Sequence, residues 1–256
     1  MLLDYQNTSF EVKDAKPDIA VLPIGATERC GEHLPVGTMN IILDALARRV
    51  AERLKGTAYL LPTMPLGTSG THQGTAGTIA LEWPTLVRVV YDLVESLLVQ
   101  GIRRAVVVVG LGGANESTAL PKENYVVKTA VRQLNYDYPE LDAIWVTPFT
   151  VAGRDLAQIL DAPEQDVHAG ELVTSLMLYL DPGAVKGKGT DYLPGAGKEY
   201  LDYVAFEKLC PGGVWGRPSL ASADKGERAF RIAVERTVQY IEESFAHLTR
   251  MKRRPY

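Results

Sequence analysis

The amino-acid sequence predicts an α/β protein in which helices cover both faces of a mostly parallel sheet. Four apolar runs of strand-like composition, at 18–24, 58–62, 104–110 and 143–148, alternate with longer segments of helical period. Parallel strands require helical crossovers, and their sequences are almost continuously apolar because both of their faces are buried. At 256 residues the chain is long enough for one full core, and we expect a single domain over residues 1–256.

The segments between these runs predict helices. Residues 40–54 place their apolar side chains on one stripe, with the charged residues largely off it, as in a crossover helix. Residues 82–101 have Pro84 near the first turn and Gly101 at the end, which is the usual asymmetry of helix punctuation. Further helices are expected over 123–134, 170–180 and 225–248.

Residues 181–200 are rich in glycine and predict an irregular loop region, either a lid or a subunit contact. In open α/β sheets, ligands bind outside the carboxyl ends of the strands. We therefore expect the functional site in the loops that follow positions 24, 62, 110 and 148.

Composition limits the classes of partner. The chain has a net charge of −4, which argues against a nucleic-acid partner. Its first residues do not form a basic segment followed by an apolar one, and no run of 18 apolar residues occurs, so we expect a cytoplasmic protein without a membrane partner. The two cysteines, Cys30 and Cys210, are expected to be free thiols in a reducing compartment.

Reactive side chains are concentrated in the loops after the predicted strands. The first loop, ERCGEHLP, holds Glu28, Cys30, Glu32 and His33. The second, PLGTSGTHQGTAGTI, holds His72, and the segment DVHAGELVTS holds His168 and Glu171. The third loop, GLGGANES, is not a nucleotide-binding loop, because no Gly-Lys-Ser/Thr follows it and Asn115 stands where GxGxxG needs its last glycine.

Four ordered motifs resemble those of the creatininase (creatinine amidohydrolase) family. The family forms GxxEQHGPHLPxGTD, GxSxxHxxFPGTISL, NGHGGN and HAGxxETS correspond here to GATERCGEHLPVGTM, GTSGTHQGTAGTIAL, VGLGGAN and HAGELVTS. The resemblance covers nearly the whole chain. It implies a three-layer α/β/α sandwich, a homo-oligomer that is commonly a hexamer, and hydrolysis of a C–N bond in a small cyclic amide by a two-metal centre.

The metal ligands that this resemblance implies are mostly replaced. The family's positions fall on Glu28, Cys30, Met39, Leu111 and Val173, and among these only Glu28 keeps the family residue. Methionine, leucine and valine do not supply the carboxylate and imidazole ligands that a hard or borderline divalent ion prefers. The sequence therefore predicts that the two-metal centre is lost and that the protein uses no metal cofactor.

A thiol beside an imidazole is the minimum for nucleophilic catalysis without a metal. We therefore take Cys30 as the candidate nucleophile and His168, or less favourably His72, as its base; Glu28 is a further candidate base. Backbone amides of Gly112 and Gly113 are candidates for an oxyanion hole. Other candidate substrate contacts are Asn115, Glu171, Met39, Leu111 and Val173, and Trp145, Trp215 and Tyr192 are candidate pocket walls.

The leading hypothesis is thus a metal-independent hydrolase of a small amide, lactone or ester, with a site changed by divergence or by deliberate redesign. A second hypothesis is a catalytically silent homologue that binds a small molecule or serves as a structural subunit. A third is an amidohydrolase that retains one metal, on Glu28, Cys30 and His168. All three assume a small-molecule partner or a homo-oligomer, and the sequence does not identify the substrate.

Overall fold

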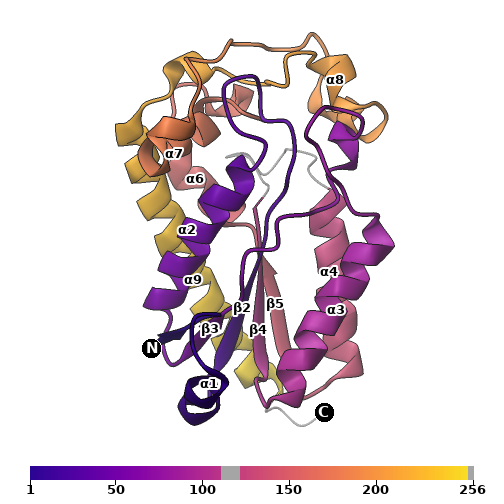
Figure 1. The fold of residues 1–256 in the computed structure, drawn as a ribbon, viewed down its shortest axis with the longest axis vertical. Coiled ribbons are helices and arrows are strands. Elements are labelled where there is room, and N and C mark those ends of the chain that lie inside the picture. The colour runs from indigo at the N-terminus through magenta and orange to yellow at the C-terminus, as the bar shows by residue number, and fades with distance from the viewer. Residues whose placement is uncertain (111–121, 253–256) are drawn as a thin grey trace.

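The computed structural model describes residues 1–110 and 122–252. Among these residues one sheet contains five strands in the order β1-β3-β2-β4-β5, and all neighbouring strands run parallel. The strands are β1 (Leu2–Leu3), β2 (Ile19–Ile24), β3 (Ala58–Leu60), β4 (Arg104–Val109) and β5 (Asp142–Val146). The predicted fold class is confirmed, and β2 and β4 occupy the interior of the sheet (Figure 1).

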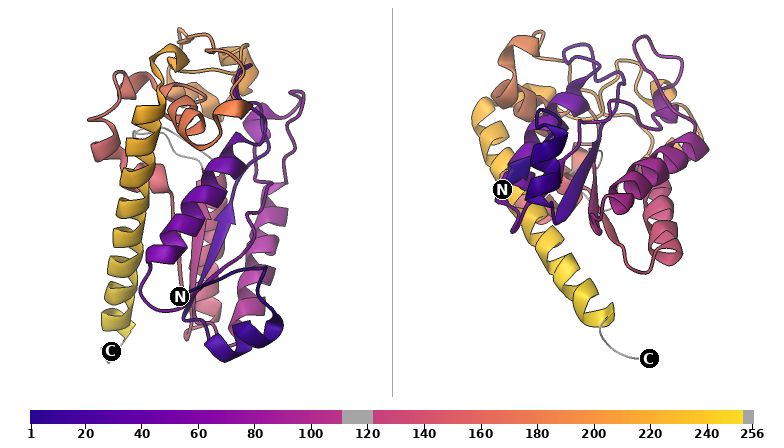
Figure 2. Two further views of the ribbon diagram at one scale, coloured as in Figure 1. Left: turned by 60° about the vertical axis from the view of Figure 1, so that its left-hand side comes forward. Right: turned by 60° about the horizontal axis from the view of Figure 1, so that its bottom comes forward.

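Helices cover both faces of the sheet. α2 (Thr38–Arg53), α7 (Glu171–Leu180) and α9 (Ala223–Lys252) lie on one face, and α3 (Trp83–Val99) and α4 (Lys122–Asp137) lie on the other (Figures 1 and 2). Each of the five predicted helices is present. The largest difference is at the C-terminal end of α9, which runs four residues beyond the predicted end at 248.

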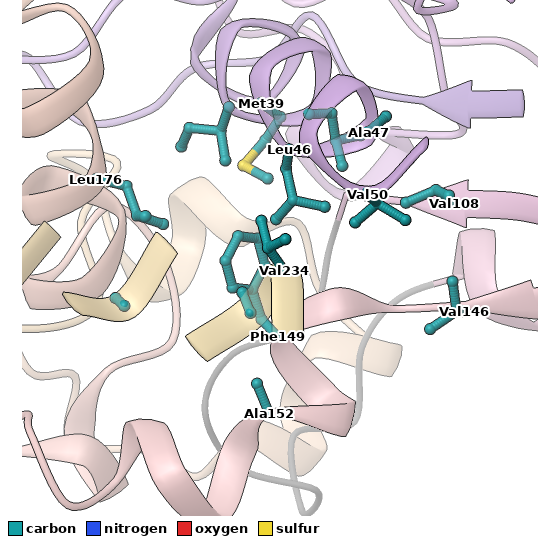
Figure 3. Close-up of a cluster of buried hydrophobic side chains, with 14 of the residues drawn as sticks. Met39, Leu46, Ala47, Val50, Val108, Val146, Phe149, Ala152, Leu176 and Val234 are labelled. Atoms are coloured by element: carbon teal, nitrogen blue, oxygen red, sulfur yellow. The ribbon is translucent and has the colours of Figure 1, made fainter. Parts of the chain in front are cut away.

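The core between the sheet and α2 explains why this arrangement is stable. Leu46 and Val50 of α2 belong to one buried cluster with Val108 of β4, Val146 of β5 and Phe149, and none of these side chains is more than 2% exposed (Figure 3). A fully buried aliphatic or aromatic side chain contributes about 1.5–3 kcal/mol to folding. The apolar stripe seen in the sequence is therefore the surface that fixes α2 on the sheet.

A short helix near the N-terminus, α1 (Ser9–Ala15), was not predicted. Thr8 caps it: the backbone N–H of Glu11 donates to the Thr8 hydroxyl at 3.3 Å, and the Thr8 N–H donates to the Glu11 carboxylate at 2.6 Å. This reciprocal pair is a capping box, which the sequence TSFE contains.

Short elements connect the long ones above the carboxyl end of the sheet. They are η1 (Gly70–His72), α5 (Pro148–Val151), α6 (Gly153–Leu156), η2 (Pro163–Gln165), η3 (Pro182–Ala184), η4 (Lys198–Asp202), α8 (Phe206–Leu209) and η5 (Pro218–Leu220). Within the predicted loop region, Tyr192 forms a backbone bridge with Gly216. Within the described ranges, no helix combines the length and apolar character needed to cross a bilayer.

Candidate metal and active site

The candidate site lies at the carboxyl end of the sheet, as the topology predicts (Figure 1). Backbone bridges join Thr27 to Ile79 and His168 to Trp215. The first bridge ties the loop after β2 to the loop after β3, and the second ties the segment before α7 to the segment after α8. Each bridge thus joins two parts of the chain that are distant in sequence, and the side chains of the candidate site come from these parts.

Three of these side chains form a compact group. Glu28, His72 and His168 each offer one ligand atom, and the three atoms all lie within 4.8 Å of one another. Glu28 comes from the loop after β2, His72 ends the short helix η1, and His168 lies three residues before α7. The structure thus brings together three of the four residues predicted to be catalytic.

Glu28 is a buried carboxyl group. Its side chain is only 2% exposed, and its Oε1 atom has no hydrogen-bond partner among the described residues. Burial raises the pKa of Glu28 from its ordinary value near 4.5 to about 7, and the neighbouring Ser69 hydroxyl lowers it only in part. An unpaired buried carboxylate is costly, so this position favours either a proton or a cation beside Oε1.

The tautomer of His168 follows from its hydrogen bond. Its Nε2 atom lies 2.9 Å from the backbone oxygen of Arg29. Because a carbonyl oxygen only accepts, Nε2 must carry the proton, and the lone pair of the neutral ring is on Nδ1. Burial lowers the pKa of His168, which favours this neutral form.

His72 is also held neutral. Burial, and then the nearby His168 and Arg29, lower the pKa of His72 to about 2. Its Nδ1 atom has no hydrogen-bond partner among the described residues, and Oε1 of Glu207 lies 3.7 Å from it. The Glu207 carboxylate accepts a hydrogen bond from the Thr75 hydroxyl, which fixes its orientation.

Phe206 covers the two imidazoles. Its ring centroid lies 4.5 Å from that of His72 and 4.9 Å from that of His168, and the two imidazole centroids are 4.6 Å apart. Neither Phe206 nor Glu207 was identified from the sequence. Both come from the four-residue helix α8, and no motif in that part of the chain indicates a role.

These residues fit one divalent cation. A carboxylate oxygen and imidazole nitrogens are the ligands that zinc and manganese accept. Both histidines are neutral, as ligation requires, and two of the buried polar atoms, Glu28 Oε1 and His72 Nδ1, lack partners within the described chain. A cation beside Glu28 would compensate the buried carboxylate.

Cys30 does not belong to this three-residue group. Its side chain is 3% exposed and lies in the apolar cluster between the sheet and α2. Burial raises the pKa of the Cys30 thiol far above its ordinary value, and the nearby Glu28 raises it further. The Thr38 hydroxyl offsets this rise only in part, so the predicted nucleophile is without structural support and stays a prediction.

Two other positions where the resemblance implies a ligand, Met39 and Val173, lie in apolar surroundings. Met39 is 4% exposed and lies in the same core cluster (Figure 3). Val173 packs against this cluster. These two side chains contribute to the core, and the predicted substrate contacts at both positions stay untested. Leu111, Gly112, Gly113 and Asn115 lie outside the described residues.

The carboxylate of Glu171 is held by hydrogen bonds within the protein. Its carboxylate is fully buried and accepts hydrogen bonds from the backbone N–H groups of Asp161 and Ala162 and from Nζ of Lys225. The carboxylate is therefore satisfied by the protein itself. The predicted contact of Glu171 with a substrate has no support in this geometry.

The three candidate wall aromatics occupy different places. Trp145, near the end of β5, packs against the core cluster that includes residues of α3 and α4. Trp215 is buried, and its backbone pairs with His168. Tyr192 is 39% exposed and lines a separate cavity. Only Trp215 thus adjoins the three-residue group.

Comparison with known proteins identifies the relatives of this chain. The family model described as Creatininase, creatinine amidohydrolase, matches residues 4–241. The chain belongs to the creatininase family. A curated relative, the mycofactocin precursor peptide peptidase of Mycobacterium ulcerans (strain Agy99), is 30% identical over 249 residues, covering 92% of this chain and 88% of its own. Creatinine amidohydrolase of Pseudomonas putida is 28% identical, covering 92% of this chain and 94% of its own.

Solved creatininases share the fold. A structure described as "Creatininase Mn" matches with a TM-score of 0.77 and 25% identity, covering 96% of this chain and 99% of that one. A mutant creatininase described as "Zn-Zn type" matches with a TM-score of 0.76 at 23% identity, over 96% of this chain and 99% of that one, and shows the fold alone.

The prediction that this creatininase-family protein uses no metal cofactor is wrong. Its similar structures include a manganese form, and Glu28, His72 and His168 form a group able to hold an ion. The sequence argument counted only the positions where the family's ligands were expected. It treated His72 as a base and did not foresee that η1 would bring its ring to 4.6 Å from that of His168.

Proposed function

We propose that the protein is a hydrolase that cleaves an amide C–N bond with one divalent ion held by Glu28, His72 and His168. The observation that carries this proposal is the unpaired, buried Glu28 oxygen in a group with two neutral imidazoles, with all three ligand atoms within 4.8 Å of one another. The names of the relatives, a peptide peptidase and a creatinine amidohydrolase, both describe amide hydrolysis and support the reaction class.

A divalent ion in such a site supplies Lewis acidity to the amide carbonyl and to water. The chain's own residues orient and shield the ligands. The Arg29 backbone oxygen holds the proton on Nε2 of His168 and so directs Nδ1 to the site. The Phe206 ring covers both imidazoles and excludes water from one side of them. The Glu207 carboxylate lies 3.7 Å from Nδ1 of His72, on one side of the group.

One ion rather than two is the stoichiometry we propose. Among the described family ligand positions, Met39 and Val173 offer no ligand atom for a hard ion, and the Cys30 thiol is buried with its pKa raised. A homo-oligomer remains our expectation from the family resemblance.

Metal content and turnover measured on the same preparations test the proposal. The protein is loaded with Zn²⁺ or Mn²⁺, dialysed and assayed for bound metal, then offered creatinine and short peptides. We expect about one ion per chain, with loss of metal in Glu28→Ala, His72→Ala and His168→Ala. His247→Ala is the matched control, because His247 is an exposed histidine of α9 outside the group.

The outcomes separate the hypotheses. Metal in the wild type and in His247→Ala, but not in the three ligand variants, together with metal-dependent turnover, supports the proposal. Turnover that survives chelation and disappears in Cys30→Ala would restore the thiol hypothesis. Stoichiometric metal without turnover on any amide would favour a binding protein.

A further inference from the structure

The turn that carries His168 contains a strained backbone. Ala169, the next residue, has a φ of 51°, in the left-handed region that is unfavourable for any residue with a Cβ atom. The other non-glycine residue with positive φ in the described ranges, Lys16, is the C-cap of α1, where this conformation is common. The helical turn before Ala169 ends at Gln165, so the surroundings of the turn must impose its conformation.

Backbone hydrogen bonds hold the entry to this turn. The Trp215 oxygen accepts from the N–H groups of Val167 at 2.9 Å and His168 at 3.0 Å, and the Trp215 N–H donates to the His168 oxygen at 2.9 Å. The His168 ring donates from Nε2 to the backbone oxygen of Arg29 at 2.9 Å. These bonds define where His168 lies, but they do not fix the path of the chain from His168 into α7.

A buried side chain closes the other end of the turn. Oδ2 of Asp166, a residue that is 5% exposed, accepts a hydrogen bond from the backbone N–H of Leu172 at 2.8 Å. Gly170, the N-cap of α7, offers no side-chain acceptor, so Asp166 supplies the one that the first N–H groups of a helix require. The bond joins residues six positions apart and encloses His168 and Ala169.

Two glycines make room for the Asp166 carboxylate beside the turn. A Cβ atom at Gly170 would lie 1.9 Å from Oδ1 of Asp166, and one at Gly216 would lie 2.9 Å from it, which is closer than such atoms approach. The Cβ at Gly170 would also lie 3.1 Å from Cα of Gly216. The carboxylate is therefore held between the turn and the segment that pairs with His168, and it cannot move without displacing one of them.

We propose that Asp166 is a positioning residue for His168. By accepting from Leu172 across the turn, it holds Ala169 in the left-handed conformation, and this conformation directs the His168 ring toward the other two residues of the metal group. The role of His168 as a ligand rests on the proposed function. The effect of Asp166 on the position of the ring does not depend on a metal and is measurable in the metal-free protein.

A role of Asp166 in capping α7 alone would respond differently to Ala169→Gly. Glycine adopts positive φ about as readily as negative φ. If Asp166 holds the turn, Asp166→Ala allows Ala169 to relax to negative φ and displaces His168, whereas the double variant Asp166→Ala/Ala169→Gly recovers much of the native turn. If Asp166 only caps α7, the glycine adds conformational freedom beside the helix, and the double variant is no better than Asp166→Ala.

Zinc affinity and ¹⁵N NMR of the imidazoles, at one fixed pH, test the proposal. The chain has four histidines, so spectra of histidine-labelled protein are simple, and His168→Ala assigns the His168 signals. In the metal-free wild type we expect a His168 proton on Nε2 that exchanges slowly with solvent, because it is bonded to the Arg29 oxygen. Asp166→Ala should lose this slow exchange and bind Zn²⁺ about 10- to 100-fold more weakly, as is usual when the support of a ligand is removed.

The double variant should regain the slowly exchanging proton and most of the affinity. Asp166→Asn, which keeps an acceptor for the Leu172 N–H, should remain close to the wild type in both measurements. Thr8→Ala is the matched control, because Thr8 caps α1, which lies at the opposite end of the sheet from α7 (Figure 1). It should leave the His168 signal and the Zn²⁺ affinity unchanged.

A native His168 signal and unchanged Zn²⁺ affinity in Asp166→Ala would overturn the proposal, and so would a double variant no better than Asp166→Ala. Ala169→Gly alone provides a test even if Asp166→Ala does not fold. Asp166 still closes the turn in that variant, so a native His168 signal is expected, and its loss would overturn the proposal. If the wild type binds no Zn²⁺, the proposed function fails, while the NMR comparison of the metal-free proteins still decides the role of Asp166.

Discussion

The buried Glu28 carboxyl group predicts an unusual pH dependence of the metal-free protein. Burial raises the pKa of Glu28 from about 4.5 to about 7. At a pH between these two values, Glu28 is mostly protonated in the folded state and mostly ionised in the unfolded state. Folding is therefore favoured most below the unfolded pKa, and that stability is lost as the pH rises through the folded pKa. At 1.36 kcal/mol for each pKa unit, the loss is about 3 kcal/mol.

The variant Glu28→Gln isolates this contribution. Gln is close in shape but does not titrate. Between pH 4.5 and pH 7 the unfolding free energy of the wild type should therefore fall by about 3 kcal/mol relative to that of Glu28→Gln. Costs of burying the amide are independent of pH and cancel in this comparison. The assay is chemical denaturation of chelator-treated protein at a series of pH values.

Added metal should offset most of this loss in the wild type. An ion that binds the folded wild type stabilises it by about 2.7 kcal/mol at a concentration one hundred times its dissociation constant. Glu28→Gln, which has lost the charged ligand, should gain little. A stability difference that does not change with pH would refute the reasoning about the buried carboxyl, and equal stabilisation of both proteins by metal would place the ion elsewhere.

Three further predictions concern neighbouring groups. Cys30→Ala should keep its metal and its turnover, and a folded, metal-loaded variant without turnover would contradict this. Glu207→Ala should weaken metal binding about 10- to 100-fold, because it removes the carboxylate that faces His72, whereas Glu207→Gln should have a smaller effect in the same equilibrium dialysis. Lys225→Ala should lower the unfolding free energy by about 3–5 kcal/mol, because it leaves the fully buried Glu171 carboxylate without its cation; a denaturant midpoint close to that of wild type would argue against this ion pair.

The sequence predicted the elements with strong periodicity and missed those without it. The four apolar runs correspond to β2, β3, β4 and β5, which are long enough or apolar enough to be recognised. Strand β1 has two residues and is paired only to β3, so no alternation could reveal it. The capping box that begins α1 is present in the sequence. No residue of α1 is buried, however, so the helix has no apolar stripe by which it could be predicted.

The site was predicted as a set of residues but not as an arrangement. Glu28, His72 and His168 were all identified from the loops in which they lie, and their common group depends on tertiary contacts that a sequence does not record. The thiol of Cys30 was taken as the candidate nucleophile, whereas its side chain lies in the core cluster. Phe206 is separated from His72 by more than one hundred residues, and only the fold shows that their rings are 4.5 Å apart.

Charge balance links the substituted family positions to a single ion. The described group contains one carboxylate and two neutral imidazoles, so one divalent ion leaves a net charge of plus one, and a second would leave plus three. Uncompensated charge of that size is strongly disfavoured in a buried site. Met39 and Val173 stand where the family resemblance implies a bridging and a terminal carboxylate, and both pack into or against the apolar cluster between the sheet and its helices. Under the single-ion proposal, the apolar side chains of Met39 and Val173 offer no negative charge to a second ion, and His72 provides a neutral ligand for the first.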